Sequence, residues 1–214
     1  MKLYTYWRSS AAYRVRIALN LKGIDYTSMP VDLLRDGGDQ QQPAYRAVNP
    51  QGLVPALNAG GEVLAQSVAI LEYLEEVHPK PALLPAASTS RAVVRSIVQS
   101  VACDIHPLCN LRVLKYLGEQ LKQDKDQIDA WYRHWIAAGL GPLEALVTEY
   151  GSAGFCVGQT VTLADVCLIP QLYNAHRFGC DTSPYPRLTA IEQHLLSLPE
   201  FAAAAPERQP DAPG

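Results

Sequence analysis

Two serines that follow an arginine, Arg8-Ser9-Ser10, form the first group able to do chemistry. Residues 3–6 alternate as a strand does, and residues 10–22 repeat apolar side chains at helical spacing. A serine hydroxyl at a helix start accepts a hydrogen bond from an unpaired amide of the first turn. The remaining amides and the positive dipole end can bind an anion or a thiolate. An ordinary capped helix with solvated arginines is the alternative.

A second helix start is expected at Gln66-Ser67, before an amphipathic segment over 68–77. With Ser67 as the N-cap, its hydroxyl and the first amides could hold a carboxylate, or the serine could serve as a cap alone. The pair Thr162 and Asp165 has the spacing of a capping box. We therefore expect Asp165 to be structural and not catalytic.

Pro107 interrupts a helical pattern that covers residues 90–121, and a bend is expected there. His106 lies next to this proline, where it is either a site residue or a hydrogen-bonded histidine without a role in chemistry. Cys103, Cys109 and His106 could supply three ligands for zinc, but the sequence shows neither a fourth ligand nor a second cluster. The sequence therefore predicts no metal site.

The elements that must position these residues fall into two groups. Residues 1–79 follow the order β-α-β-α-β-β-α, which predicts a thioredoxin-like α/β domain. Residues 80–88 are a proline-rich linker, and residues 89–214 are predicted to form an all-α domain. Its helices are expected at 90–121, 125–149, 162–178 and 186–195, followed by a loosely ordered proline-rich tail over 206–214.

The composition excludes several classes of protein. A net charge of −3 gives no electrostatic case for binding nucleic acid. No apolar run approaches the ~20 residues of a membrane span, and the charged start of the chain is unlike a signal peptide. The five cysteines contain no C-x-x-C pair, which indicates reduced thiols. We therefore expect a cytoplasmic protein.

Taken together, the motifs resemble the zeta class of the cytosolic glutathione transferases, the maleylacetoacetate isomerases. The resemblance covers nearly the whole chain. Each motif is short and weak by itself, so the resemblance rests on the occurrence of all of them in the same order. The matching segments are Arg8-Ser9-Ser10-x-x-x-Arg14-Val15-Arg16-Ile17-Ala18-Leu19, Asn49-Pro50-Gln51-Gly52-Leu53-Val54-Pro55, Gln66-Ser67 and Pro184-Tyr185-Pro186.

This resemblance implies a glutathione site and a homodimer. It also implies a cis bond between Val54 and Pro55, with the Val54 backbone pairing with the cysteinyl part of glutathione in the manner of an added strand. The implied glutathione-binding residues are Ser9, Ser10, Gln40, Gln51, Val54, Gln66, Ser67, His106 and Asn110.

The implied reaction is the cis–trans isomerisation of maleylacetoacetate, or of the related maleylpyruvate, by addition and elimination of the glutathione thiolate. Ser9 or Ser10 and the first-helix amides would lower the pKa of that thiol. Arginine forks match carboxylates, so Arg8, Arg112 and Arg177 are the candidates for holding a dicarboxylate substrate.

The chain departs from the zeta-class pattern at Ala11, where most members carry a cysteine, and at Tyr13, which replaces a tryptophan. Alanine supplies no nucleophile, so the sulfur would have to come from glutathione. Two other functions stay open: a transferase that conjugates glutathione or dehalogenates α-halo acids, and a noncatalytic binding module with this fold. Retention of Ser9, Ser10, Gln66-Ser67 and the Val54-Pro55 step argues against the module, whereas loss of the cysteine favours it.

Overall fold

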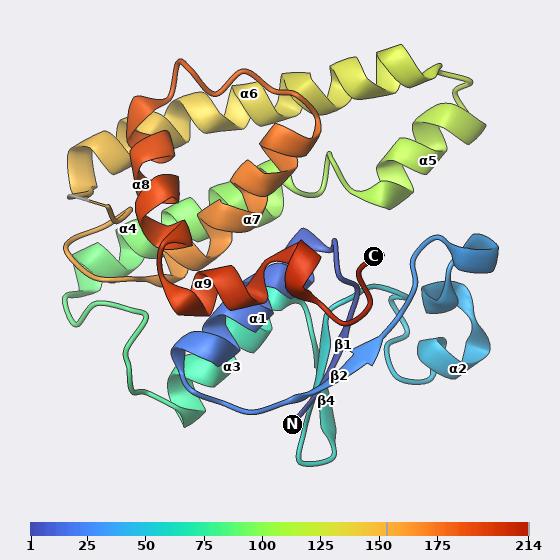
Figure 1. The fold of residues 1–214 in the computed structure, drawn as a ribbon, viewed down its shortest axis with the longest axis horizontal. Helices are drawn as coiled ribbons and strands as arrows, with labels where there is room; N and C mark the ends of the chain where they lie inside the picture. The colour runs from blue at the N-terminus through green and yellow to red at the C-terminus, as the bar shows by residue number, and fades with distance from the viewer. Residues whose placement is uncertain (153, 214) are drawn as a thin grey trace. The chain divides into compact units, whose positions relative to one another are not determined.

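The computed structural model describes residues 1–152 and 154–213. The chain divides into two compact units, Met1–Leu83 with Ser197–Gly214, and Leu84–Leu196. This division differs from the expected one, which placed everything after residue 88 in the helical domain. The reason is helix α9 (Pro199–Ala204), which packs against α1 (Ser10–Leu21) in the N-terminal unit (Figure 1).

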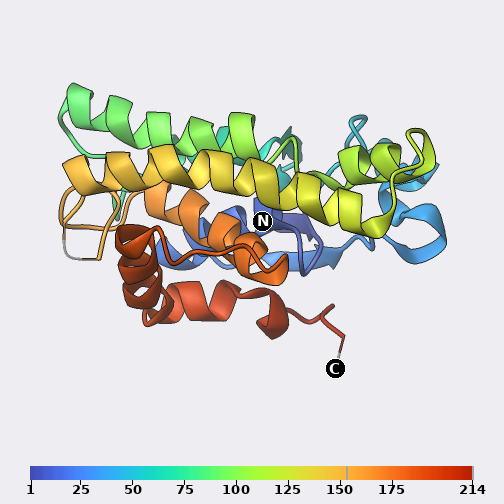
Figure 2. The same ribbon diagram turned by 90° about the horizontal axis from the view of Figure 1, so that it is seen from above.

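The helical unit is built around α7 (Leu163–Arg177), which packs against α4 (Ser88–Gln99) and α8 (Pro186–Leu196). Twelve of the fifteen residues of α7 are buried, including the polar Asp165, Gln171 and Asn174, so this helix runs through the core of the helical unit. Figure 2 shows α4, α6 (Lys125–Tyr150) and α7 lying side by side. The helices expected over 125–149, 162–178 and 186–195 are therefore confirmed.

The helix expected over 90–121 is instead divided into three parts. α4 ends at Gln99, a π-helical turn η3 (Ser100–Ile105) follows, and α5 (Leu111–Glu119) begins after Pro107. Proline has no N–H to continue the helical ladder, so the predicted interruption at Pro107 is confirmed. The π-helical turn before it was not predicted from the sequence.

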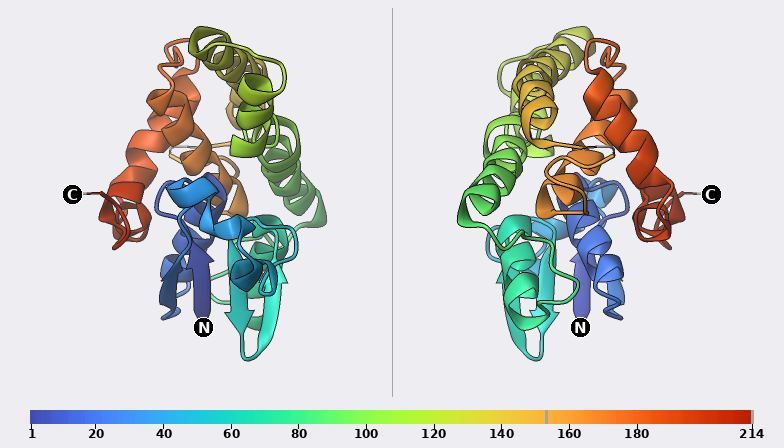
Figure 3. Two further views of the ribbon diagram at one scale, coloured as in Figure 1. Left: turned by 90° about the vertical axis from the view of Figure 1, so that its right-hand side faces the viewer. Right: turned by 90° about the vertical axis from the view of Figure 1, so that its left-hand side faces the viewer.

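The N-terminal unit contains a four-stranded sheet with the order β2-β1-β3-β4. β1 pairs in parallel with β2 and antiparallel with β3, and β3 forms a hairpin with β4. Figure 3 shows this hairpin next to β1, with β4 at the edge of the sheet. The predicted thioredoxin-like arrangement is thus confirmed. The strands are Lys2–Thr5 (β1), Thr27–Pro30 (β2), Ala56–Ala59 (β3) and Glu62–Ala65 (β4).

Helices cover the two faces of this sheet. α1 packs against α3 (Ser67–Val77) on one side, and the short helix α2 (Pro43–Arg46) lies on the other (Figure 1). Two single-turn helices, η1 (Arg35–Gly37) and η2 (Asp39–Gln41), precede α2. On the α2 side, the ring of Tyr45 packs edge-on against that of Tyr4, with the two ring centroids 5.9 Å apart.

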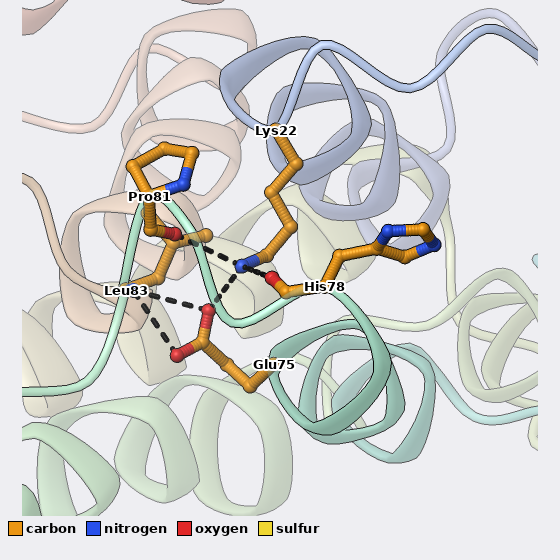
Figure 4. A network of polar contacts seen from close by, with 5 residues as sticks. All are labelled: Lys22, Glu75, His78, Pro81 and Leu83. Carbon is orange, nitrogen blue, oxygen red and sulfur yellow. Dashed lines mark hydrogen bonds and ion pairs between the residues drawn. The ribbon is translucent and has the colours of Figure 1, made fainter.

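A buried ion pair joins the ends of α1 and α3 to the connector that follows them (Figure 4). Lys22 Nζ contacts the Glu75 carboxylate and donates to the carbonyl oxygens of His78 and Pro81, at 2.7 and 3.0 Å. The amide of Leu83 donates to the same carboxylate at 3.0 Å. These bonds hold the start of the proline-rich connector to the N-terminal unit.

The chain end is more ordered than the sequence predicted. After α9, a 3₁₀ turn η4 spans Pro206–Arg208, and the Asp211 carboxylate accepts a hydrogen bond from the amide of Trp7. The expectation of a loosely ordered tail was wrong, because contacts with residues about two hundred positions earlier stabilise it. No helix in the described part of the chain is long and apolar enough to cross a membrane.

Candidate functional site

The start of α1 has the geometry that the sequence predicted. Ser9 is the N-cap, with an extended backbone and an Oγ that accepts from the amide of Ala12 at 3.2 Å. Ser10 is the first helical residue, and it is buried. The first-turn amides and the positive end of the helix dipole therefore lie directly after β1, next to two hydroxyl groups.

The start of α3 differs from the prediction in one respect. Ser67 was expected to be the N-cap, but it is the first helical residue, and Gln66 holds the cap position without a side-chain cap bond. Gln66 has φ +70°, in the left-handed region that non-glycine residues rarely adopt. Such an outlier commonly marks a ligand-binding position, because the surrounding structure must maintain it.

Arg14 lies beside this second helix start. Its Nη1 donates to Ser67 Oγ at 3.1 Å, and its side chain is buried, with 1% of the residue exposed. A guanidinium that contacts the first residue of α3 adds a full positive charge to the partial charge of the helix end. In the sequence, Arg14 is only one residue of a matching motif, and its contact with Ser67, 53 positions away, could not be read from a local pattern.

Three glutamines stand among the predicted glutathione ligands. Gln66 Nε2 donates to Gln51 Oε1 at 2.7 Å, so the structure brings these two together. Gln40 is buried, and its Oε1 finds no hydrogen-bond partner among the described residues. Its close packing requires glycine at position 38, where a Cβ would lie 2.4 Å from the Gln40 amide.

The turn before β3 has the predicted cis bond between Val54 and Pro55. Two side chains hold this turn by donating to the carbonyl oxygen of Leu53, namely the Tyr45 hydroxyl at 2.7 Å and Asn49 Nδ2 at 2.8 Å. Burial raises the pKa of Tyr45 to about 12, so the hydroxyl keeps its proton and acts as the donor. Neither side chain was named as a site residue, although Asn49 belongs to the motif quoted for the resemblance.

Arg8 follows β1 and is partly exposed, with its guanidinium 5.1 Å from the ring of Trp7. The exposure leaves it able to meet an anionic molecule. Arg16, in contrast, is fully buried and donates to the hydroxyl of Thr5 and to the backbone of the β1–α1 loop. Of the three arginines near the first helix, the structure thus leaves Arg8 as the one with exposed surface.

The other predicted residues belong to the helical unit. His106 is half-buried directly after the π-helical turn, and Asn110 is the N-cap of α5, accepting from the amide of Arg112 at 3.1 Å. Arg112 is exposed, as is Arg177, whose guanidinium lies 4.5 Å from the ring of Phe178. Asn110 therefore has a capping task that the sequence did not predict.

Asp165 has the structural task that was expected of it. Its carboxylate accepts from the amides of Thr162 and Cys156, at 2.7 and 2.8 Å, and completes the predicted capping box. Burial raises the pKa of this carboxyl group, and the two backbone hydrogen bonds oppose that rise. Within the described residues, no group of three or more histidine, cysteine or acidic side chains could hold a metal ion.

The N-terminal unit therefore offers two helix starts, a pair of bonded glutamines and a buried amide oxygen without a partner. Helix starts favour anions and thiolates, and amide side chains both donate to and accept from a peptide. These groups can bind the carboxylate, amide and thiol groups of a short cysteine-containing peptide such as glutathione.

Comparison with known proteins agrees with this geometry. Residues 8–77 match the family model of the glutathione S-transferase N-terminal domain. The whole chain is 51% identical to the maleylacetoacetate isomerase of Pseudomonas aeruginosa, covering 100% of this chain and 99% of that protein.

Two solved structures are also similar over their full length. A maleylpyruvate isomerase, described as a bacterial zeta-class glutathione S-transferase in its holo form, has a TM-score of 0.97 and 45% identity over 100% of both chains. A maleylacetoacetate isomerase from Methylobacterium extorquens, with bound malonate and glutathione, has a TM-score of 0.95 and 45% identity, again over 100% of both chains.

Proposed function

We propose that this chain, which belongs to the zeta-class glutathione transferase and maleylacetoacetate isomerase family, is a glutathione-dependent cis–trans isomerase. Its substrate would be maleylacetoacetate or the related maleylpyruvate, which places it in the catabolism of aromatic compounds. The observation that carries the proposal is the pair of helix starts in one unit, one capped by Ser9 and one bearing Ser67 against Arg14.

The residues of the N-terminal unit divide the binding of glutathione between them. Ser67, Arg14 and the first amides of α3 would hold the γ-glutamyl carboxylate, because charge and free N–H groups converge there. The backbone of Val54 would pair with the cysteinyl part, and the glutamines 40, 51 and 66 would bind its amide groups.

The start of α1 would then receive the thiol. Ser9 already accepts from a helix amide through its oxygen, so its hydroxyl hydrogen stays available to a thiolate. The helix dipole and the partly exposed Arg8 favour the same negative charge. When bound, glutathione supplies the sulfur nucleophile whose reversible addition makes the substrate double bond a rotatable single bond.

The dicarboxylate would be held by arginines. Arg8, Arg112 and Arg177 are the candidates, and all three keep exposed surface in their own units. A guanidinium binds a carboxylate with two parallel hydrogen bonds and so fixes both its position and its plane. The amides at the start of α1 and a serine hydroxyl would stabilise the negative charge that develops on the substrate, which is where catalysis gains most.

Ala11 distinguishes this chain from most of its family, because it places a methyl group in the first turn of α1 where a thiol is usual. A route through a protein sulfur at that position is closed to it. The proposed route needs only the glutathione sulfur, and the altered side chain is expected to affect substrate preference.

We also propose a homodimer in the cytoplasm. Exposed apolar side chains such as Tyr116, Leu121 and Leu34 are each at least half exposed and could be covered by a second copy. No disulfide links the five cysteines within the described residues, which suits a reducing compartment. Light scattering during gel filtration would test the dimer, and a mass of one chain would contradict it.

The proposed reaction is tested by following the loss of maleylacetoacetate absorbance with and without glutathione, for the wild type and for Arg8→Ala. Turnover that requires glutathione and falls at least about tenfold in the variant supports both the reaction and the role of Arg8. Absence of turnover with both maleylacetoacetate and maleylpyruvate would contradict the isomerase. Binding of glutathione without isomerisation would then favour conjugation or dehalogenation, and no binding would favour a noncatalytic module.

A further inference from the structure

The peptide groups of the β1–α1 loop are held by one side chain from the following helix and one from the end of the chain. The amide of Trp7 donates to Asp211 Oδ2 at 2.8 Å, and the carbonyl oxygen of Trp7 accepts from Arg16 Nη2 at 3.0 Å. Both polar groups of this residue are therefore engaged. Trp7 lies two positions before Ser9, so these bonds fix the loop that leads into Ser9 and Ser10 at the start of α1.

Arg16 links that loop to the last helix. Its side chain is fully buried, and it donates to Thr5 Oγ1 at 3.2 Å, to the carbonyl oxygen of Tyr6 at 3.4 Å and, through Nε, to that of Ala204 at 3.0 Å. The planar guanidinium fixes several carbonyl groups in one geometry. The loop and the end of α9 are thus held by a single side chain.

Asp211 completes this arrangement from the end of the chain. Its second carboxylate oxygen, Oδ1, is buried and has no hydrogen-bond partner among the described residues. A buried carboxylate oxygen without a partner is unfavourable for folding, so stability alone does not account for this arrangement. The turn η4 and the bond of Gln209 Nε2 to the carbonyl oxygen of Ala205, at 2.9 Å, bring the tail back toward the loop.

We propose that Asp211 is a positioning residue, which holds the amide of Trp7 and thereby sets where the Ser9 hydroxyl and the first amides of α1 face the glutathione sulfur. This inference rests on the proposed function for its chemical consequence, and on the Trp7 contact alone for its structural part. Asp211 acts through Trp7 and touches neither substrate nor cofactor.

A matched pair of truncations tests the structural part. Removal of residues 211–214 deletes the carboxylate, whereas removal of residues 212–214 shortens the tail and retains it. Arg208→Ala, at an exposed position of the same tail, is a point-mutation control for Asp211→Ala. Hydrogen exchange of the Trp7 amide in the ligand-free protein is expected to accelerate at least about tenfold in the 211–214 truncation and in Asp211→Ala, and in neither control.

The chemical part is tested by the ultraviolet signal of the bound thiolate at fixed pH near neutrality. Loss of the Asp211 contact is expected to lower the thiolate fraction by about three- to tenfold, because a misplaced hydroxyl and amides stabilise the charge less. Asp211→Asn keeps an acceptor oxygen and removes the charge, so it should restore the signal. A repulsive effect of the Asp211 charge would instead make the Asn variant exceed the wild type, which would overturn the positioning role.

Other outcomes are equally decisive. Unchanged exchange at Trp7 in Asp211→Ala would overturn the anchoring of the loop. Faster exchange throughout the protein, with a lower melting temperature, would assign Asp211 to general stability and overturn the positioning role. A wild type that shows no thiolate signal at saturating glutathione would overturn the proposed function and the chemical part together, while exchange at Trp7 would still decide the anchoring.

Discussion

Arg14 Nη1 lies 3.1 Å from Ser67 Oγ, in a buried hydrogen bond that joins α1 to the first residue of α3. The two residues are separated by 53 positions in the chain. This bond means that the hydroxyl at the second helix start is oriented by a positive charge, and both groups face the place where we expect the glutathione carboxylate.

Ser67→Ala is therefore expected to weaken glutathione binding about tenfold, the loss of one hydrogen bond to a charged group. Arg14→Lys retains the charge and removes the planar fork, so a loss of similar size is expected. Calorimetric titration of both variants and of the double variant measures their coupling. Strictly additive losses would contradict a shared carboxylate site, because residues in one network couple by roughly 0.5–3 kcal/mol.

Ser9 has a capping task and a proposed chemical task, and two substitutions separate them. Ser9→Ala removes the cap and is expected to lower the free energy of unfolding by about 1 kcal/mol, whereas Ser9→Gly lowers it by only a few tenths. Alanine and glycine both lack a hydroxyl, so the turnover rate of both variants should fall about tenfold. Denaturant unfolding and steady-state rates provide the measurements. Turnover that follows stability, and is retained in the glycine variant, would show that Ser9 is only a cap.

Gly139 and Gly141 lie two residues apart in α6 but in different surroundings. A Cβ at Gly139 would lie 2.2 Å from Ile105 Cδ1, at the end of the π-helical turn, whereas a Cβ at Gly141 would meet nothing within 4 Å. Gly139→Ala is expected to lower the free energy of unfolding by about 1–3 kcal/mol, because the added methyl group overpacks this contact. Gly141→Ala should instead stabilise by roughly 0.5–1 kcal/mol through helix propensity.

Urea denaturation of both alanine variants checks this expectation. Ile105→Val in the Gly139→Ala background removes the methyl group nearest to the added Cβ, so it should recover part of the lost stability. Equal effects of the two alanines would contradict a close approach of the π-helical turn to α6.

The ion pair of Lys22 and Glu75 is buried, with 0% and 10% of the two side chains exposed. Lys22→Met leaves the Glu75 carboxylate without its cation, and we expect a loss of about 3–5 kcal/mol in the free energy of unfolding. The exposed pair of Lys125 and Asp129 is the control, because Lys125→Ala should leave the denaturation midpoint unchanged. Similar midpoints for the two variants would contradict the buried network of Figure 4.

The cysteines should differ widely in reactivity. Cys103 is exposed, whereas burial raises the pKa of Cys109 to about 12, with the neighbouring Cys180 adding to the rise. Only the thiolate reacts, and at pH 8, about four units below this pKa, roughly one Cys109 thiol in ten thousand is ionised. Iodoacetamide should label Cys103 first, and Cys103→Ser should remove that fast phase.

Burial also raises the pKa of Cys180, which is partly exposed. Its labelling should therefore increase with pH above the range in which an ordinary thiol is already ionised. Mass spectrometry of the labelled peptides gives the order directly. Fast labelling of Cys109 in the native protein would contradict its burial.

Features that depend on neighbours along the chain were predictable. The cap at Ser9 and the capping box of Thr162 and Asp165 each follow from a few consecutive residues, because helix ends are satisfied locally. The periodicity of apolar residues likewise predicted the first strand and most helices. The resemblance added the cis bond before Pro55, which spacing alone does not indicate.

The amino-acid sequence by itself determined the order of elements, the two helix starts and the chemical types of the site residues. Only the tertiary structure decided that Ser67 is oriented by Arg14, that Arg16 holds the β1–α1 loop and that Asp211 reaches Trp7. It also decided that the last eighteen residues, Ser197–Gly214, group with the N-terminal unit. The contact of Arg14 with Ser67 spans 53 positions and that of Trp7 with Asp211 spans 204, whereas Arg16 and Trp7 are nine positions apart across the end of a loop. No local propensity or periodicity encodes which of these polar groups will satisfy one another.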